Sequence, residues 1–167
     1  MPLKVYNTYS RRVEVFTPIT EGLVKMFVCG PTVYDYLHLG HARTYIFYDV
    51  VARYLRYLGY KVTFIINITD IDDKIFEKAR REGRSASEIA SKYKEACIED
   101  LRRIGVETVT LFAQASAYLA QMIQQIQTLL EKGYAYKTSR SIYFDTSKFP
   151  TFGTLSHQNR AELSLHR

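Results

Sequence analysis

Two histidines on either side of a glycine form the clearest chemical feature of this sequence. His38 and His41 flank Gly40 in the segment HLGH, which follows the apolar run 24–28. The N-terminus of a helix exposes unpaired N–H groups and carries a partial positive charge, so it attracts phosphate. The glycine allows close approach of a ligand, and imidazoles can donate hydrogen bonds to a phosphate whose charge grows during reaction. The segment therefore predicts a nucleotide site, and a helix start with two solvated histidines is the alternative.

Two apolar runs predict the elements that would position this segment. Residues 24–28 and 62–66 are rich in β-branched and aromatic side chains, which favours buried parallel strands. Between them a helix is predicted, with Gly59 as its C-terminal cap. Its predicted core face comprises Phe47, Val50, Val51, Tyr54, Leu55 and Leu58, at helical spacing. Strand, helix and strand in this order form a βαβ unit with a right-handed crossover.

The topology of that unit predicts where a ligand would bind. In parallel sheets ligands lie outside the carboxyl ends of the strands. Residues 29–41 follow the first predicted strand and residues 67–70 follow the second, so both segments should reach the same cleft.

Further elements are predicted from caps and periodicity. A helix should run from Thr69 and Asp70 to Gly83. Ser85 and Glu88 have the spacing of a capping box and should begin the next helix. The apolar side of that helix comprises Ile89, Tyr93, Cys97 and Leu101. An extended stretch at 106–112, a helix from Leu119 to Gly133 and a hairpin of 134–136 with 141–144 complete the predicted elements.

Several residues of the predicted cleft have two readings. Cys29, a lone cysteine at a strand end, is by default a small buried apolar residue, and its place at the carboxyl end of the strand favours a functional role as the alternative. Asp70, Asp72 and Asp73 are either a metal cluster or carboxylates in the first turn of a helix, where the helix dipole favours them. Thr69 is either a helix cap or part of a pocket.

The cleft segment also carries a family resemblance. Residues 27–43 read FVCGPTVYDYLHLGHAR and resemble the signature of cysteinyl-tRNA synthetases. Similar segments occur at 5–8, at 67–74 (NITDIDDK) and at 130–136. The resemblance implies an α/β fold: the N-terminal half of a doubly wound (Rossmann-like, HUP-type) parallel sheet over residues 1–112, then the start of an α+β connective insertion over residues 113–167.

The resemblance implies a reaction as well. Members of the family are class I aminoacyl-tRNA synthetases, which activate cysteine with ATP and magnesium to cysteinyl-adenylate and transfer the cysteinyl group to cysteine tRNA. His38 and His41 would be catalytic and, with Gly40 and Thr32, would bind ATP.

The same resemblance assigns the amino-acid pocket. Gly30 and Thr69 would line the site for the substrate cysteine. Cys29 would be a zinc ligand, and zinc would select cysteine because it binds a thiolate tightly and a serine hydroxyl poorly.

Departures from the family leave alternatives open. Gln114 stands where the family usually has Arg, and Tyr118 stands where many members have His. The later Lys-Met-Ser-Lys-Ser signature is absent. That signature, the other zinc ligands, the anticodon-binding domain and most tRNA contacts are expected beyond residue 167, so the isolated chain is expected to be inactive in aminoacylation. A free-standing module that binds nucleotide, cysteine or RNA, or a cysteine ligase of thiol biosynthesis, is the alternative.

Composition sets broader bounds. No apolar run approaches the roughly 20 residues that a membrane span needs, and residues 1–4 show no signal-peptide character. These features predict a cytoplasmic protein without a membrane partner, in which two cysteines without Cys-x-x-Cys spacing stay reduced. The net charge of +6 suits a polyanionic partner such as tRNA or ATP, although most of the basic residues are predicted to lie on solvated helix faces.

Overall fold

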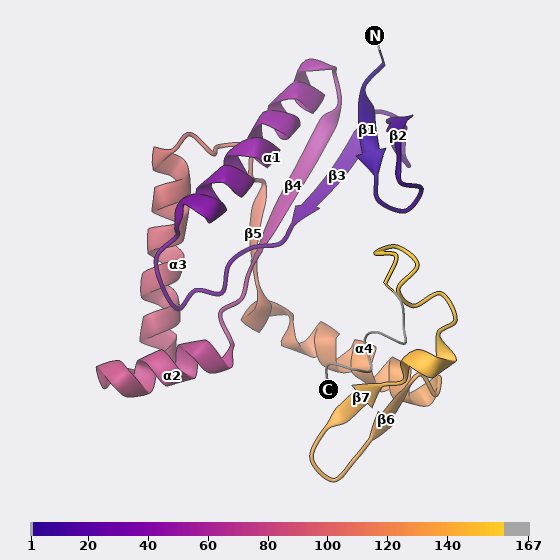
Figure 1. The fold of residues 1–167 in the computed structure, drawn as a ribbon. Coiled ribbons are helices and arrows are strands. Elements are labelled where there is room, and N and C mark those ends of the chain that lie inside the picture. Colours follow the sequence, from indigo (N-terminus) through magenta and orange to yellow (C-terminus); the bar gives the residue numbers. More distant parts are fainter. Residues whose placement is uncertain (1, 159–167) are drawn as a thin grey trace. The chain divides into compact units, whose positions relative to one another are not determined.

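The computed structural model describes residues 2–158, which form two units of internal contacts (Figure 1). One unit is continuous, Pro18–Leu119, and the other joins Met1–Thr17 to Ala120–Arg167. The two units are defined by contacts between residues and do not test a domain boundary, so the division predicted after residue 112 stays a prediction. Within the described residues, no helix is both long and apolar enough to cross a bilayer.

The continuous unit contains the parallel sheet that the sequence predicts. Its strands are β3 (Leu23–Val28), β4 (Lys61–Ile68) and β5 (Leu111–Gln114), in the spatial order β3-β4-β5 and all parallel. Helix α1 (Leu39–Tyr57) connects β3 to β4. The α/β fold class and the βαβ unit are therefore confirmed, and β4 is slightly longer than predicted.

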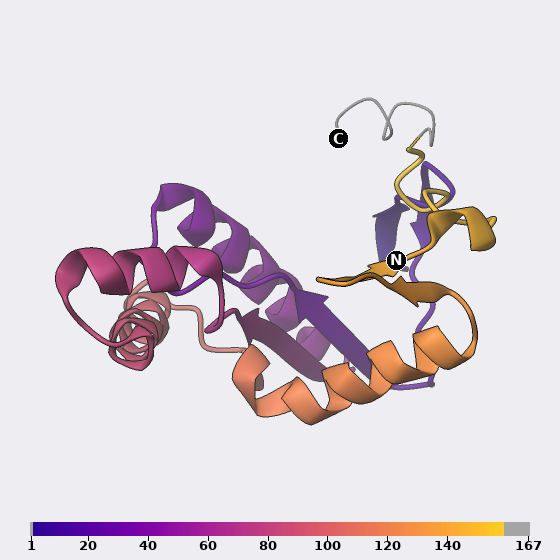
Figure 2. The same ribbon diagram turned by 90° about the horizontal axis from the view of Figure 1, so that it is seen from below.

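The core of this unit lies on one face of the sheet. Alternate residues of β4 are buried: Val62, Phe64, Ile66 and Ile68. Figures 1 and 2 show α1, α2 (Asp73–Glu82) and α3 (Ala86–Arg103) gathered beside the sheet. The predicted apolar side of α3 is buried in full, and the Ser85–Glu88 capping box is present.

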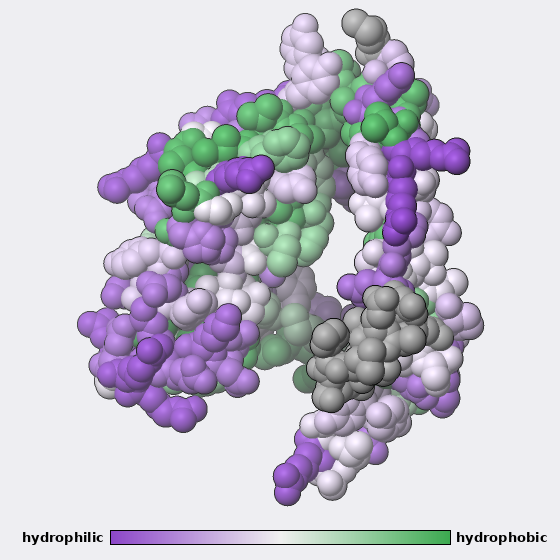
Figure 3. All heavy atoms as spheres, viewed as in Figure 1, coloured by the Kyte–Doolittle hydropathy of each residue, from purple (hydrophilic) through white to green (hydrophobic). Residues whose placement is uncertain are grey.

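The predicted core face of α1 is wrong except at Leu55. Phe47 is 61% exposed, and Val50 and Tyr54 are exposed as well; Figure 3 shows apolar surface over this helix. The helix buries Tyr45, Asp49, Ala52 and Leu55, of which only Leu55 belongs to the predicted face. Apolar side chains occur on both sides of α1. The buried side is the one that carries Asp49, whose carboxylate accepts hydrogen bonds there. A prediction from hydrophobicity alone does not identify this side.

The helix predicted from Thr69 begins later in the structure. The Thr69 N–H donates to the Pro31 carbonyl (3.1 Å) and its carbonyl accepts from the Val33 N–H (3.1 Å), so this backbone stays extended. The helix α2 begins only at Asp73, with the Asp72 carboxylate as its N-cap, and ends at Gly83 as predicted. Strand β5 likewise covers only the end of the predicted stretch 106–112 and then continues to Gln114.

The second unit is smaller and has no buried helix face among its described residues. Its strands β1 (Lys4–Asn7) and β2 (Arg12–Val15) form an antiparallel hairpin that the sequence analysis did not anticipate. Helix α4 (Leu119–Glu131) is followed by the predicted hairpin of β6 (Ala135–Lys137) and β7 (Ile142–Phe144). A hydrogen-bond contact of 2.8 Å between His157 Nε2 and the Thr8 carbonyl joins the two ends of this unit.

Candidate functional site

A cleft of about 400 Å³ lies at the carboxyl ends of β3 and β4, where the topology predicts a ligand. We call it the histidine cleft. It is lined by Gly30, Pro31, Thr32, Tyr34, Asp35, Tyr36, Leu37, His38, His41 and Lys74. Four residues singled out from the sequence, Gly30, Thr32, His38 and His41, therefore lie together, and Gly40 lies in the first turn of α1 between the histidines.

The two histidines cap the helix that carries them. His38 is the N-cap of α1, and its Nδ1 accepts a hydrogen bond from the Gly40 N–H (3.1 Å). The Nδ1 of His41 accepts from the His38 N–H (3.3 Å), and the two rings stack with centroids 3.9 Å apart. Because each Nδ1 accepts, the proton of each neutral ring is on Nε2. Each Nε2–H is then a donor for a ligand oxygen.

The charge state of His41 agrees with this arrangement. Burial lowers the pKa of His41, and the neighbouring His38 lowers it further. His41 is therefore neutral near pH 7 and supplies a hydrogen bond without a full charge.

The segment before the histidines is fastened to α2 and α3. The ammonium of Lys78 lies 3.2 Å from the Asp35 carboxylate, 3.7 Å from Glu82 and 4.6 Å from the ring centroid of Tyr93. Tyr36 packs edge-on against the same tyrosine, with centroids 5.1 Å apart. Asp35 thus has a structural partner that the sequence did not reveal. Hydrogen bonding from the Tyr36 N–H and the contact with Lys78 lower the pKa of Asp35.

Gly30 and Thr69, assigned to the amino-acid pocket by resemblance, are connected through Asn67. The Gly30 N–H donates to Asn67 Oδ1 (2.8 Å), which fixes the orientation of the amide, and Asn67 Nδ2 donates to Thr69 Oγ1 (3.4 Å). A Cβ at position 30 would lie 1.5 Å from the Asn67 carbonyl oxygen, so only glycine fits there. The sequence analysis missed Asn67 as a site residue, although a polar side chain on an apolar strand is a signal.

Cys29 is exposed at the end of β3. Its carbonyl accepts a hydrogen bond from the buried Tyr45 hydroxyl (3.2 Å), so α1 holds the backbone at this position. Within residues 2–158 no three or more His, Cys, Asp or Glu side chains form a group that could hold a metal ion. The described residues therefore offer Cys29 as a single candidate ligand and do not by themselves make a zinc site.

The reading of Asp70, Asp72 and Asp73 as a metal cluster is not supported within the described chain. Asp72 caps α2 and Asp73 lies in its first turn. Asp70 accepts hydrogen bonds from Ser116 N–H (2.9 Å), the Ser116 hydroxyl and Gln114 Nε2 (3.2 Å). Burial alone would raise the pKa of Asp70, but these hydrogen bonds lower it. Gln114, a departure from the family pattern, thus helps to join β4 to β5.

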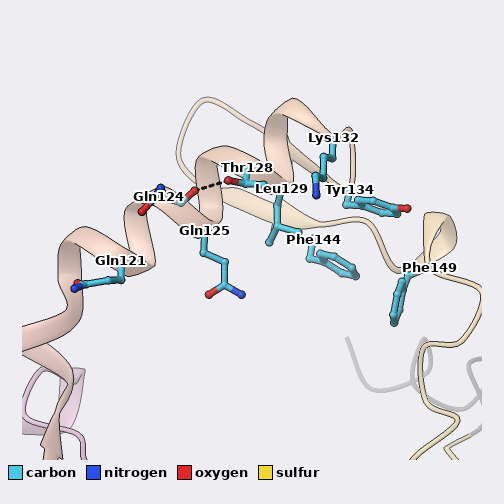
Figure 4. Close-up of a pocket in the computed structure, with 9 residues that line it drawn as sticks. All are labelled: Gln121, Gln124, Gln125, Thr128, Leu129, Lys132, Tyr134, Phe144 and Phe149. Atoms are coloured by element: carbon cyan, nitrogen blue, oxygen red, sulfur yellow. Dashed lines mark hydrogen bonds between the residues drawn. The ribbon is translucent and has the colours of Figure 1, made fainter.

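A further cavity, of about 630 Å³, lies in the second unit between α4 and the β6–β7 hairpin (Figure 4). Glutamines 121, 124 and 125 line it from α4, and the rings of Tyr134, Phe144 and Phe149 line it from the hairpin side. The residues predicted from the sequence as site residues lie elsewhere.

Comparison with known proteins gives the same family that the cleft motif suggests. The family model described as "tRNA synthetases class I (C) catalytic domain" matches residues 15–167. Cysteine–tRNA ligase of Thermoplasma acidophilum is 48% identical over 94% of this chain and 35% of its own length. Cysteine–tRNA ligase of Lachnospira eligens is 47% identical over 99% of this chain and 35% of its own. The chain thus spans about a third of the length of these relatives.

Solved structures support the fold. Methionyl-tRNA synthetase of Mycobacterium tuberculosis, in complex with methionyl-adenylate, aligns with a TM-score of 0.61 at 19% identity, over 67% of this chain and 23% of that one. The LeuRS of Agrobacterium radiobacter K84, in a ternary complex with tRNA and LeuAMS, aligns with a TM-score of 0.61 at 21% identity, over 72% of this chain and 16% of that one. These likenesses show the fold, and the family match over residues 15–167, with relatives that are cysteine–tRNA ligases, shows that the chain belongs to the class I tRNA synthetase catalytic-domain family.

Proposed function

We propose that this chain is a catalytic portion of a cysteine–tRNA ligase. In the proposed reaction the carboxylate of cysteine attacks the α-phosphorus of ATP, bound with magnesium, and pyrophosphate leaves. A hydroxyl at the 3′ end of cysteine tRNA then attacks the carbonyl carbon of the resulting adenylate, so that the cysteinyl group passes to the tRNA and AMP leaves. The proposal is carried by the histidine cleft at the start of α1, in a chain whose relatives bear that name.

The cleft residues supply positioning and electrostatic stabilisation in this proposal. The Nε2–H groups of His38 and His41 would donate to phosphate oxygens, and the N-terminus of α1 would add the partial positive charge of the helix dipole. Such preorganised donors stabilise charge that develops in the transition state. Thr32 and Gly40 would complete the contacts to ATP.

Cysteine would bind beside Gly30 and Thr69, where the side chain of Asn67 holds both residues. Cys29 stays a proposed zinc ligand. The described residues do not complete a zinc site, so the proposed reaction depends on the two histidines and the N-terminus of α1.

The proposal is tested by cysteine-dependent exchange between ATP and pyrophosphate. We would measure it on this chain and on a protein of the relatives' length that carries it, with serine in place of cysteine as the control. Exchange that requires cysteine and falls by about a hundredfold or more in His38→Ala and His41→Ala supports the proposal. Exchange that does not depend on cysteine, or that survives both substitutions, contradicts it.

Two further measurements complete the test. Charging of cysteine tRNA by the longer protein separates a tRNA ligase from a cysteine ligase of thiol biosynthesis. Aminoacylation by the isolated chain is expected to be absent. A cytoplasmic location, predicted from the N-terminal sequence, is also part of the proposal.

A further inference from the structure

The histidine cleft contains one lysine whose role neither the motif nor the family comparison assigns. Lys74 is the only lysine or arginine among the described residues that line the cleft. It is the second residue of α2, and its own N–H donates to the Asp72 carboxylate (3.0 Å), which fixes its backbone beside the cleft.

The ammonium of Lys74 is available to a ligand. It lies 5.4 Å from the ring centroid of Tyr34, another lining residue, and forms no ion pair with any of residues 2–158. Lys78 differs, because its side chain is only 15% exposed and is bound to Asp35 and Glu82. Of these two lysines of α2, only Lys74 combines a place on the cleft wall with an uncommitted charge.

The cleft needs such a charge if it binds a polyphosphate. His41 is neutral near pH 7, because burial and His38 lower its pKa, so it contributes a donor without a full charge. Asp35 brings a negative charge to the wall, which Lys78 offsets. Lys74 is then the permanent positive charge that remains to face an anionic ligand. A hydrogen bond between an ammonium and a phosphate is stronger than one between neutral groups.

We propose that the Lys74 ammonium binds a phosphate group of the nucleotide that occupies the histidine cleft. This inference rests on the proposed use of ATP. The amino-acid carboxylate is the other anion that could meet this ammonium, and the experiment separates the two.

The experiment is a calorimetric titration of this chain with ATP, with adenosine and with cysteine. Lys74→Met removes the charge and keeps much of the length, and Lys74→Arg keeps the charge. Lys61→Met is the matched control, because Lys61 is an exposed lysine at the opposite, amino end of β4. We expect Lys74→Met to weaken ATP binding roughly tenfold or more, with adenosine unaffected. Lys74→Arg should lose less of its affinity for ATP, and Lys61→Met should bind ATP as tightly as the unaltered chain does.

Each other outcome overturns the proposal in a recognisable way. Unchanged ATP affinity in Lys74→Met overturns the role of Lys74 and leaves the proposed function standing. Equal losses for ATP and adenosine assign Lys74 to the shape of the cleft, and a loss for cysteine alone assigns it to the amino-acid carboxylate. If the unaltered chain binds neither ATP nor adenosine, the proposed nucleotide use by this chain fails together with the inference.

Discussion

At the scale of single residues, His38 and His41 combine two tasks. Their Nδ1 atoms accept hydrogen bonds from backbone N–H groups at the start of α1, and their Nε2–H groups remain to donate outward. An imidazole that gains a second proton can no longer accept. Protonation therefore breaks the cap as well as adding charge.

This coupling predicts the pH response of His41. Because its pKa is lowered in the folded state, the unfolded chain binds the proton more readily, and stability should rise with pH up to about 6.5. Proton NMR of the imidazole, assigned with His41→Asn, should give a midpoint below 6.5. Faster exchange of the His38 amide, which donates to His41 Nδ1, should accompany protonation. A midpoint at or above 6.5 would show that burial and His38 do not control this ring.

Gly30 predicts a steric effect at the same end of the sheet. In Gly30→Ala the added Cβ would overlap the Asn67 carbonyl oxygen, since the available distance is 1.5 Å. The strands would have to separate, and we expect a loss of about 3 kcal/mol or more in the free energy of unfolding. Urea denaturation measures it, with Leu39→Ala as the control because Leu39 is exposed. Equal stability of the two variants would mean that the strand ends move freely.

Cys29 leads to a prediction about metal content. One described candidate ligand cannot hold zinc tightly, because structural and catalytic zinc sites use three or four protein ligands. Elemental analysis of the purified chain should therefore find well below one zinc per chain, and a protein of the relatives' length should hold more. Tight stoichiometric zinc in this chain would refute the prediction.

At the scale of elements, Asp49 fastens α1 to the segment before β5. Its carboxylate is buried and accepts from the Thr108 N–H (2.8 Å), the Thr108 hydroxyl (2.6 Å), the Glu107 N–H (3.0 Å) and Arg53 Nε (2.6 Å). Burial alone would raise the pKa of Asp49, but these hydrogen bonds outweigh it and the pKa falls. The ionised carboxylate is thus the form that holds the two elements together.

Asp49→Asn should therefore lower the free energy of unfolding by about 2–4 kcal/mol at pH 7. A lowered pKa means that this contribution is complete above the unfolded value near 3.8 and is lost as pH falls through the lower folded value. The difference in the free energy of unfolding between Asp49→Asn and the unaltered chain should therefore decrease in that acid range. Glu99→Gln is the control, since Glu99 forms only exposed pairs with Arg102 and Arg103. If that difference in the free energy of unfolding stays constant at acid pH, the ionised carboxylate of Asp49 is not what stabilises the chain.

Asp49 illustrates which parts of the fold can be predicted from the sequence and which cannot. Strands β3 and β4 and the capped helix α3 follow local rules of alternation, periodicity and capping, and they appear as expected. The buried face of α1 could not be read in that way, because it depends on hydrogen bonds from Glu107 and Thr108, which are distant in sequence. Asn67 was missed for a similar reason, since the pairing of β3 with β4 brings its partner Gly30 close. Tyr45 was missed because its contact with the Cys29 carbonyl depends on how α1 packs at the end of β3.

At the scale of the whole molecule, one face of the sheet carries a partly exposed apolar row. Phe27, Ile65 and Leu111 stand side by side in register across the three strands; Phe27 is 67% exposed, Leu111 is exposed and Ile65 is half-buried. Within residues 2–158 no further strand pairs with β3 or β5, and exposed apolar surface on a sheet with such open edges favours association.

We therefore expect this chain to self-associate as its concentration rises. Phe27→Glu should reduce the association without unfolding the chain, because the side chain is already largely in water. Ile19→Glu is the matched control, since Ile19 is fully exposed and lies outside the strands. Sedimentation velocity measures both variants. If the unaltered chain stays monomeric at high concentration, the row of Phe27, Ile65 and Leu111 does not mediate association.

The discontinuous unit cannot assemble in the order in which its residues are translated. Residues 18–119 form one continuous unit, whereas β1 and β2 belong with residues 120–158, to which the contact between Thr8 and His157 connects them. During synthesis from the N-terminus, the first hairpin leaves the ribosome long before its partners exist. A two-stranded hairpin alone is marginally stable, and its unit must close a loop of about a hundred residues, which costs entropy unless the intervening chain has already folded. The β1–β2 hairpin, although translated before residues 18–119, is therefore expected to reach its final structure after them.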